Sequence, residues 1–461
     1  MLDAQHIQAL KEIVGEENCF DDKAHKLAYC YDATRNRYEP DAVIFPRCEE
    51  DVSRLLAYCN THKITIVPRG AGSGFTGGSL PVNGGIVLAF EKHMNKILEI
   101  DMENMVARVQ PGVVNKRLQE AVEAMGLFYP PDPASEEYST LGGNVSENAG
   151  GMRAAKYGIT KDYVMALRAV LPNGDIIRAG KKTIKDVAGY NIAGILIASE
   201  GTLAVITEIT LKLLSKPKLR QSAMGVFPTI ESAMNAVYKT MAAGVTPVAM
   251  EFLDNLTIRA VESKFSKGLP VEAGAILITD MDGNLPEEIE LQMAKIEEKF
   301  KENGALSFKK AASEEEAKDL WFARRNASQS VTIYGKKKLN EDITVPRSKL
   351  PELLQRINAI SERYGVKTPC FGHTGDGNVH VNVMVEDGSD PKQLEIGHQA
   401  IEEIFKAAVE LEGTLSGEHG IGISKAPFMH LAFTPEEMNL FRAIKQAFDP
   451  NNILNNGKMA L

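Results

Sequence analysis

The sequence predicts an α+β protein of two domains, and three observations favour that class. Apolar residues with helical spacing alternate with short β-branched runs along the chain. The chain has 461 residues, whereas a single domain usually has about 100–200. The composition also changes at Ser215-Lys-Pro-Lys218. We therefore expect a domain boundary near residue 218.

Helices are predicted where apolar residues recur every three or four positions. In 5–14 they fall at positions 7, 10, 13 and 14, and in 49–62 they fall at 52, 55, 56 and 59. Each set lies on one helical face, which indicates a helix packed against the rest of its domain. The predicted helices, in chain order, are 5–14, 49–62, 113–125, 230–243, 286–303 and 435–448.

Strands are predicted from short apolar, β-branched runs between turn residues. Asn173-Gly174 separates two such runs, which is typical of a β-hairpin. From residue 219 onward helices and strands alternate, as in a ferredoxin-like α+β layer. The predicted strands, in chain order, are 40–46, 64–67, 86–90, 106–112, 164–171, 175–178, one within 199–214, 275–279 and 379–385.

Composition and charge restrict the class of partner and the compartment. The formal charge of −9 argues against a broad basic surface, so we expect no nucleic-acid partner. The five cysteines form no Cys-x-x-Cys pair, and an odd, scattered set suits a reducing compartment. No signal peptide is visible, and the longest uncharged apolar stretch, Val187–Ser199, is too short to span a bilayer. We expect a cytoplasmic protein, with peripheral attachment to a membrane left open.

Two glycine-rich regions are candidate cofactor loops. Gly72-x-Gly74-x-x-Gly77 follows a strand but leads into another turn, so it lacks the helix that a dinucleotide-binding βαβ unit needs. The second region contains Gly142-Gly143 and Gly150-Gly151. Several loops with unobstructed backbone N–H groups could together wrap an extended anion, such as the pyrophosphate of a flavin dinucleotide. The alternative is ordinary glycine-rich turns between strands.

A histidine and glutamate constellation is the second candidate site. Valines alternate from Val379 to Val385, so a strand there places His380 and Asn382 together on its other face. His373 lies across a glycine-rich turn, and Glu418 lies in a later glycine-rich loop. Two histidines and one glutamate suit zinc, iron or manganese. The alternative is that these histidines are structural residues of turns.

Several motifs resemble the vanillyl-alcohol-oxidase-type FAD fold. The resemblance runs over nearly the whole chain and is strongest to the flavoprotein subunits of glycolate oxidases and the flavin D-lactate and D-2-hydroxyglutarate dehydrogenases. It rests on Pro68-Arg-Gly-Ala-Gly-Ser-Gly-Phe-Thr-Gly-Gly78, Pro131-Asp-Pro-Ala-Ser135, Leu141-Gly-Gly-Asn144, Asn148-Ala-Gly-Gly151, Tyr157-Gly158 and Ser199-Glu-Gly-Thr-Leu203.

The resemblance implies a two-subdomain FAD-binding domain over 1–218 and a ferredoxin-like substrate cap over 219–424. Residues 425–461 would then return to the flavin. FAD should be non-covalent, because no histidine lies between His62 and His93 to attach it. The implied flavin contacts are Arg69, Gly70, Ala71, Gly72, Ser73, Gly74, Thr76, Gly77, Pro131, Thr140, Gly143, Ser146, Asn148, Gly151, Gly158, Ile206 and Asn456.

The same resemblance assigns the catalytic residues. It implies His373, His380 and Glu418 as ligands of a divalent metal and His419 as the base. Arg324, the first arginine of Trp321-Phe-Ala-Arg-Arg325, would bind the substrate carboxylate, and we interpret the second arginine as a solvated helix end. Two further catalytic candidates share faces with these residues: Ser328, one helical turn after Arg324, and Asn382, beside His380.

The function that follows is FAD-dependent oxidation of a small D-2-hydroxy acid, D-lactate or glycolate, to the 2-oxo acid. The metal would activate the hydroxyl, a histidine would accept its proton, and hydride would pass to flavin N5. The cysteines bind no cluster in this interpretation, so the electron acceptor acts in trans: an iron–sulfur subunit, an electron-transfer flavoprotein or a quinone.

Three alternatives remain at this point. A D-2-hydroxyglutarate dehydrogenase is disfavoured, because relatives with that specificity carry a lysine where this chain has Asn340. A non-catalytic FAD-binding subunit is disfavoured by the presence of all four metal and base residues. Flavin-assisted ether-lipid synthesis on the same fold is the third, and it would demand space for an acyl chain.

Overall fold

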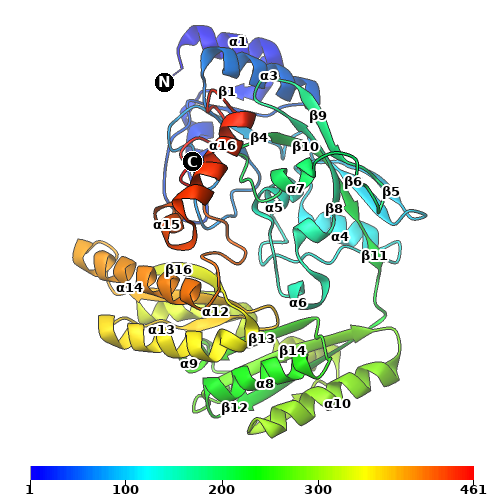
Figure 1. The fold of residues 1–461 in the computed structure, drawn as a ribbon, viewed down its shortest axis with the longest axis vertical. Helices are drawn as coiled ribbons and strands as arrows, with labels where there is room; N and C mark the ends of the chain where they lie inside the picture. The colour runs from blue at the N-terminus through cyan, green and yellow to red at the C-terminus, as the bar shows by residue number, and fades with distance from the viewer. Residues whose placement is uncertain (1) are drawn as a thin grey trace. The chain divides into compact units, whose positions relative to one another are not determined.

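The computed structural model describes residues 2–461, which divide into two compact units. The first unit contains the chain up to Gly150, then Ile159–Lys216 and Glu418–Leu461. The second contains Gly151–Gly158 and Pro217–Gly417. Each unit packs helices on β-sheets, which confirms the α+β class (Figure 1).

A four-stranded sheet opens the first unit, and its three longer strands run parallel. The apolar faces of α1 (Ala4–Val14) and α3 (Glu49–His62) join the buried core of this sheet, as their helical spacing predicted. In spatial order its strands are β1 (Cys19–Phe20), β2 (Ala42–Ile44), β4 (Ile86–Ala89) and β3 (Ile66–Arg69).

A five-stranded antiparallel sheet forms the rest of the first unit. Its β8–β9 hairpin turns at Asn173-Gly174, where Gly174 has a φ of +90°, so the hairpin prediction is confirmed. In spatial order its strands are β5 (Ile97–Asp101), β6 (Val106–Val109), β10 (Val205–Lys212), β8 (Val164–Val170) and β9 (Ile176–Gly180). The unit also contains α2 (Lys23–Tyr29), α4 (Asn115–Glu123), β7 (Leu127–Phe128), α5 (Leu141–Glu147), α7 (Ile192–Leu196), β11 (Leu214–Ser215), α15 (Met429–Ala432) and α16 (Pro435–Phe448).

A seven-stranded sheet organises the second unit. Helices α8, α10, α13 and α14 cover one of its faces, and α9 and α12 cover the other (Figure 1). In spatial order its strands are β15 (Ser307–Lys310), β12 (Leu219–Phe227), β14 (Ala275–Gly283), β13 (Ala249–Asp254), β17 (Cys370–His373), β18 (Asn378–Val385) and β16 (Lys337–Thr344). Its helices are α6 (Ala154–Tyr157), α8 (Ile230–Ala242), α9 (Asn255–Phe265), α10 (Pro286–Glu302), α11 (Glu314–Leu320), α12 (Phe322–Ser330), α13 (Leu350–Tyr364) and α14 (Pro391–Glu410).

The second glycine-rich region differs from the expected run of loops, because its first part is the helix α5. Thr140 caps this helix by accepting a hydrogen bond from the backbone N–H of Gly143. Gly142 is needed for close packing, since a Cβ there would lie 2.6 Å from Cβ of Pro111. Capping and close approach therefore outweigh the low helix propensity of the glycines.

The end of the chain is part of the first unit and packs against its earlier residues. Asn455 donates hydrogen bonds from Nδ2 to the carbonyls of Gly78 and Glu200. The buried Lys458 ammonium donates to the Leu80 carbonyl at 2.6 Å. These contacts hold the turn that follows the first glycine-rich loop.

No helix among the described residues is both long and apolar enough to cross a bilayer.

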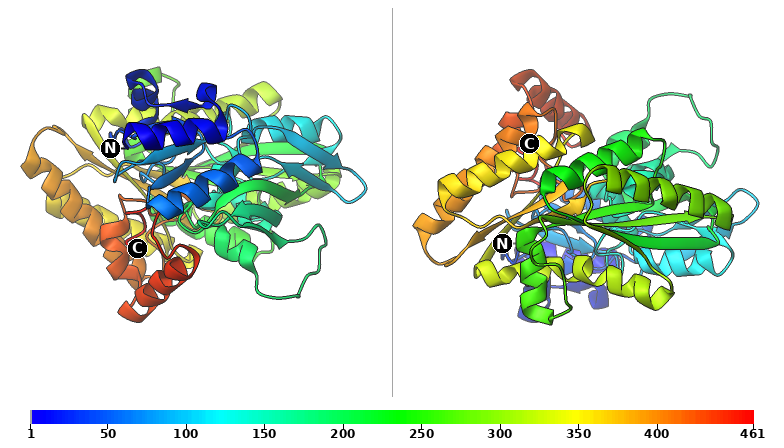
Figure 2. Two further views of the ribbon diagram at one scale, coloured as in Figure 1. Left: turned by 90° about the horizontal axis from the view of Figure 1, so that it is seen from above. Right: turned by 90° about the horizontal axis from the view of Figure 1, so that it is seen from below.

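The segment from Lys181 to Asn191, between β9 and α7, is exposed at every residue. Both views in Figure 2 show this green loop extending away from its unit, and Tyr190 is 91% exposed. We expect limited trypsin digestion to cut first after Lys181, Lys182 or Lys185, as fragment masses would show. A variant with glutamine at the three lysines should resist this cleavage; first cuts elsewhere would contradict the prediction.

Candidate functional site

A pocket in the first unit is built mainly from four stretches of chain, and Phe90 and Pro111 complete its lining. The four stretches are the loop after β3, the segment that contains α5, the start of β10 with the residues before it, and the pair Glu418 and His419. The pocket therefore combines residues as far apart in the sequence as Pro68 and His419, which only the folded unit brings together.

Close packing of glycines shapes the loop after β3. A Cβ at Gly70 would collide with Oγ1 of Thr140, the residue that caps α5. Gly72 has a φ of +66°, which favours glycine. Arg69 donates from its guanidinium to the Tyr31 carbonyl at 2.7 Å, which fixes the start of the loop.

Replacing Gly70 with alanine should destabilise the first unit. The new methyl group must displace the Thr140 hydroxyl, and we expect a loss of about 1–3 kcal/mol in the free energy of unfolding of the apoprotein. Gly74→Ala is the matched control, because a Cβ there has nothing within 4 Å. Chemical unfolding of both apoproteins tests this, and equal stabilities would contradict it.

The structure sorts the expected flavin residues into two groups. Those outside the pocket lining have packing contacts instead: the Thr76 hydroxyl donates to the His419 carbonyl, and Asn148 accepts from the N–H of Lys161. The residues that line the pocket are Arg69, Gly70, Ala71, Gly72, Ser73, Gly74, Thr140, Gly143, Ser146 and Ile206. Those that do not line it are Thr76, Gly77, Pro131, Asn148 and Asn456 in the first unit, and Gly151 and Gly158 in the second.

Two buried carboxyl groups, Glu147 and Glu200, line the pocket and were missing from the predicted site. Burial raises the pKa of both, and the charge of Glu200 raises the pKa of Glu147 further. Glu200 also accepts hydrogen bonds from the N–H groups of Ile421 and Gly422, at 2.7 and 2.8 Å. Glu200 lies within the motif Ser199-Glu-Gly-Thr-Leu203, whereas no motif of the sequence contains Glu147.

The raised pKa of Glu147 predicts a pH dependence of stability. The folded protein retains a proton at Glu147 that the unfolded chain releases above about pH 4.5, so this group lowers stability as the pH rises through that range. Glu147→Gln should remove this contribution and stabilise the apoprotein at neutral pH more than at acidic pH. Unfolding of both proteins at about pH 5 and about pH 8 tests it; a parallel response would contradict it.

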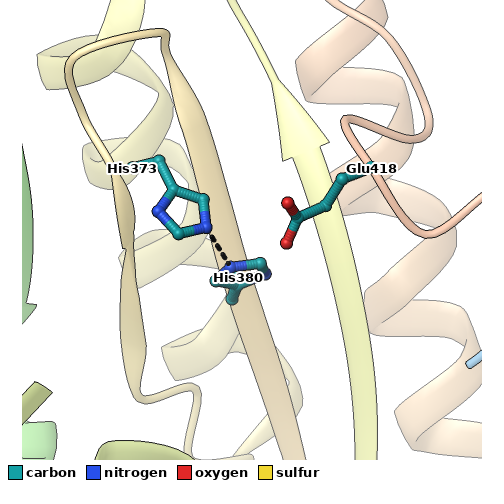
Figure 3. A group of neighbouring side chains, drawn as sticks. All are labelled: His373, His380 and Glu418. Atoms are coloured by element: carbon teal, nitrogen blue, oxygen red, sulfur yellow. Dashed lines mark hydrogen bonds between the residues drawn. The ribbon is translucent and has the colours of Figure 1, made fainter. Parts of the chain in front are cut away.

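His373 and His380 form a close pair in the second unit. His373 is the last residue of β17 and His380 is the third residue of β18, on either side of the turn 374–377, and both side chains are buried. Their Nε2 atoms lie 3.2 Å apart (Figure 3). Paired strands and a short turn thus direct two imidazole nitrogens at one point.

Glu418 supplies an oxygen to the same point. It follows Gly417, whose N–H donates to Oδ2 of Asp342 on β16 at 2.8 Å. One ligand atom from each of His373, His380 and Glu418 lies within 4.8 Å of the others. Figure 3 shows these three side chains directed toward one another. Two nitrogens and one carboxylate oxygen are a donor set that suits a divalent transition metal.

The other predicted catalytic residues of the second unit lie on α12 and β18. Arg324 donates from Nε to Oε2 of Glu251 at 2.6 Å, and its guanidinium lies 5.0 Å from the centre of the Phe371 ring. Ser328 accepts at Oγ from the Lys338 ammonium at 2.7 Å. Asn382 donates from Nδ2 to the carbonyl of Pro369 at 3.1 Å.

Strand pairing also locates position 340. Asn340 of β16 lies directly opposite Asn382 of β18, so their side chains share a face. Asp342 is paired with His380 in the same way. The uncharged Asn340 therefore occupies the face of the sheet that carries the histidine pair.

His419 lies in the first unit beside the pocket. Its ring is 5.2 Å from the Phe75 ring, centre to centre, and its Nε2 lies 3.9 Å from Oε1 of Glu418. The Thr76 hydroxyl holds its backbone. These contacts place an imidazole at the wall of the pocket.

Comparison with known proteins places these features in a family. Residues 216–459 match the family described as FAD linked oxidases, C-terminal domain, and residues 40–180 match an FAD binding domain. The chain is 45% identical to glycolate oxidase subunit GlcD of Bacillus subtilis, covering 98% of this chain and 96% of the relative. It is 34% identical to a D-lactate dehydrogenase of Anaerostipes hadrus, covering 99% and 96%.

Solved structures show the same fold. The structure of p-cresol methylhydroxylase aligns with a TM-score of 0.81 at 16% identity, covering 99% of this chain and 96% of that one. Alkyldihydroxyacetonephosphate synthase aligns with a TM-score of 0.77 at 20% identity, covering 99% and 86%. The expected vanillyl-alcohol-oxidase-type fold is thereby confirmed.

Proposed function

Because this chain belongs to the family of FAD-linked oxidases, we propose that it oxidises a small D-2-hydroxy acid, D-lactate or glycolate, to the 2-oxo acid. It is an FAD-linked oxidoreductase. The choice of substrate is supported by its relatives, of which one is named a glycolate oxidase subunit and another a D-lactate dehydrogenase.

One observation carries the proposal. The adjacent residues Glu418 and His419 both line the pocket, and Glu418 also contributes to the oxygen and nitrogen cluster with His373 and His380. The proposed proton acceptor and the proposed metal ligand are therefore consecutive in the chain, at the wall of the pocket that would hold the cofactor.

The residues fit both groups that the chemistry requires. The pocket glycines leave the backbone accessible, and Gly70, Gly72 and Gly143 with Thr140 and Ser146 would hold FAD without a covalent bond. Bound FAD supplies a two-electron acceptor for hydride. His373, His380 and Glu418 would hold the divalent ion, for which zinc, iron and manganese are the candidates. That ion supplies a Lewis acid for the substrate oxygens.

The chain's own side chains bind the substrate and move a proton. Arg324 would bind the carboxylate through its Nη groups, because its Nε already donates to Glu251. His419 Nε2 would take the hydroxyl proton as the hydride leaves Cα, so the acid loses two electrons and two protons in all. Asn382 and Ser328 are proposed to contact the bound acid.

We also propose an electron acceptor in trans. The five cysteines are unbridged, and four of them are buried separately in the core. Cys19, Cys30, Cys48 and Cys59 have no spacing that would hold an iron–sulfur cluster. The acceptor would be an iron–sulfur subunit, an electron-transfer flavoprotein or a quinone, and a relative named as a subunit supports a protein partner.

An anaerobic titration of the purified protein tests the proposal. D-lactate, L-lactate, glycolate and D-2-hydroxyglutarate would be added separately while flavin absorbance is recorded, before and after chelation. We expect D-lactate or glycolate to bleach the flavin, and chelation to abolish the bleaching. A flavin that no acid reduces would favour a non-catalytic subunit, and full turnover with oxygen alone would contradict the acceptor in trans.

D-2-hydroxyglutarate serves as the negative arm of this titration. Asn340 and Asp342 lie on the same face of β16, and Asp342 is paired with His380. The second carboxylate of D-2-hydroxyglutarate would form no ion pair with the uncharged Asn340. We therefore expect the diacid to reduce the flavin more slowly than D-lactate.

A further inference from the structure

We propose that Glu251 is a positioning residue that holds His373 as a metal ligand and Arg324 as a carboxylate clamp, through the two oxygens of one buried carboxylate. The inference rests on the proposed function, which supplies the metal and the hydroxy acid. No sequence pattern points to Glu251.

Strand pairing places Glu251 between its two partners. It lies on β13 directly opposite His373 on β17, and its side chain is fully buried. Oε1 lies 2.6 Å from Nδ1 of His373, and Oε2 lies 2.6 Å from Nε of Arg324. Each carboxylate oxygen therefore serves one functional side chain.

The first contact decides the tautomer of His373. An ionised carboxylate can only accept, so the proton of a neutral imidazole must lie on Nδ1. The lone pair then lies on Nε2, the atom that faces Nε2 of His380 at 3.2 Å. Metal-binding histidines are usually oriented in this way by a carboxylate behind the ring. Glu251 thus presents to an ion the nitrogen that can bind it.

The second contact pairs the buried carboxylate with a cation and fixes the arginine. Nε of Arg324, whose side chain is 13% exposed, lies 2.6 Å from Oε2 of Glu251, so the buried carboxylate has a cationic partner. The bond to Nε holds the guanidinium plane, which leaves the Nη edge for a substrate carboxylate. Metal ligand and substrate clamp therefore share one anchor.

Glu251→Gln separates the two tasks. A glutamine side chain has one acceptor oxygen and one NH₂ donor, so it cannot accept from both Arg324 and His373. The cation attracts the oxygen, and the NH₂ group then faces Nδ1 of His373, which forces the proton to Nε2. We expect the metal-free protein with bound FAD to bind Mn²⁺ about 10–100-fold more weakly, measured by electron paramagnetic resonance titration.

Asp280→Asn is the matched control. Asp280 is a fully buried carboxylate on the neighbouring strand β14, and it accepts from the Trp321 indole at 2.9 Å and from Arg220. Replacing the Asp280 carboxylate with an amide should disturb the same sheet, but the Mn²⁺ affinity of the variant should stay within threefold of the wild type. FAD content and thermal unfolding would confirm that each variant is folded.

A second measurement needs no stable variant at Glu251. In ¹⁵N-histidine spectra of the metal-free wild type, His373 should have its proton on Nδ1, with its signal assigned by loss in His373→Gln. A proton on Nε2 of His373 in the wild type would overturn the inference. A Glu251→Gln variant that binds Mn²⁺ with wild-type affinity would also overturn it. If the wild type binds no Mn²⁺, the metal centre of the proposed function fails instead.

Discussion

His419→Ala should slow reduction of the flavin by the hydroxy acid by about 10²–10⁴-fold, because general-base catalysis contributes that much. FAD should remain bound, since the imidazole is one of many groups in the pocket wall. Stopped-flow absorbance under anaerobic conditions measures the rate, and the ratio of flavin to protein absorbance measures occupancy.

His430→Ala is the control for this experiment. His430 is an exposed histidine of the same unit, and its Nδ1 lies 2.8 Å from the Pro427 carbonyl oxygen. In the His430→Ala variant the hydroxy acid should reduce the flavin at the wild-type rate. An unchanged rate in the His419 variant would refute the assignment of the base.

Arg324→Met should have the second large effect. Loss of a buried charge pair with the substrate typically costs about 2–5 kcal/mol, which corresponds to a fall of about 30- to several-thousand-fold in kcat/KM. The variant also leaves Glu251 buried without its cation, so we expect about 3–5 kcal/mol less stability. Steady-state kinetics and chemical unfolding measure the two effects.

Arg325→Met is the matched control, one residue along α12. Its guanidinium donates to the Lys318 carbonyl, away from Glu251. We expect kcat/KM close to that of the wild type. Equal losses in the two variants would show that helix packing, and not a clamp on the substrate, explains the effect of Arg324.

Local patterns could be predicted from the sequence because they follow from periodicity. The helix expected at 49–62 is α3, Glu49–His62, and the alternation of valines in β18 placed His380 and Asn382 on one face. Both results need only the spacing of apolar residues along a few turns or a single strand. The fold class followed from the order of such elements together with the glycine-rich motifs.

Contacts between distant residues could not be predicted in this way. Glu251 and His373 are 122 positions apart, and only the register of β13 with β17 brings them together. No sequence pattern indicates the raised pKa of Glu147, because one of its causes is the charge of Glu200, which comes from another stretch of chain. The low helix propensity of glycine argues against a helix at α5 for the same reason: the close approach of Gly142 to Pro111 is a tertiary contact.

The first unit is assembled from three stretches of chain, and this has a consequence for biosynthesis. Ile453 and Leu454 complete the core of its four-stranded sheet, and Asn455 holds Gly78, yet these residues are translated only after the whole second unit. A nascent chain that has emerged only to Lys216 lacks these contacts. We therefore expect the first unit to capture flavin only after residues 453–455 have left the ribosome, because its four-stranded sheet is incomplete until then.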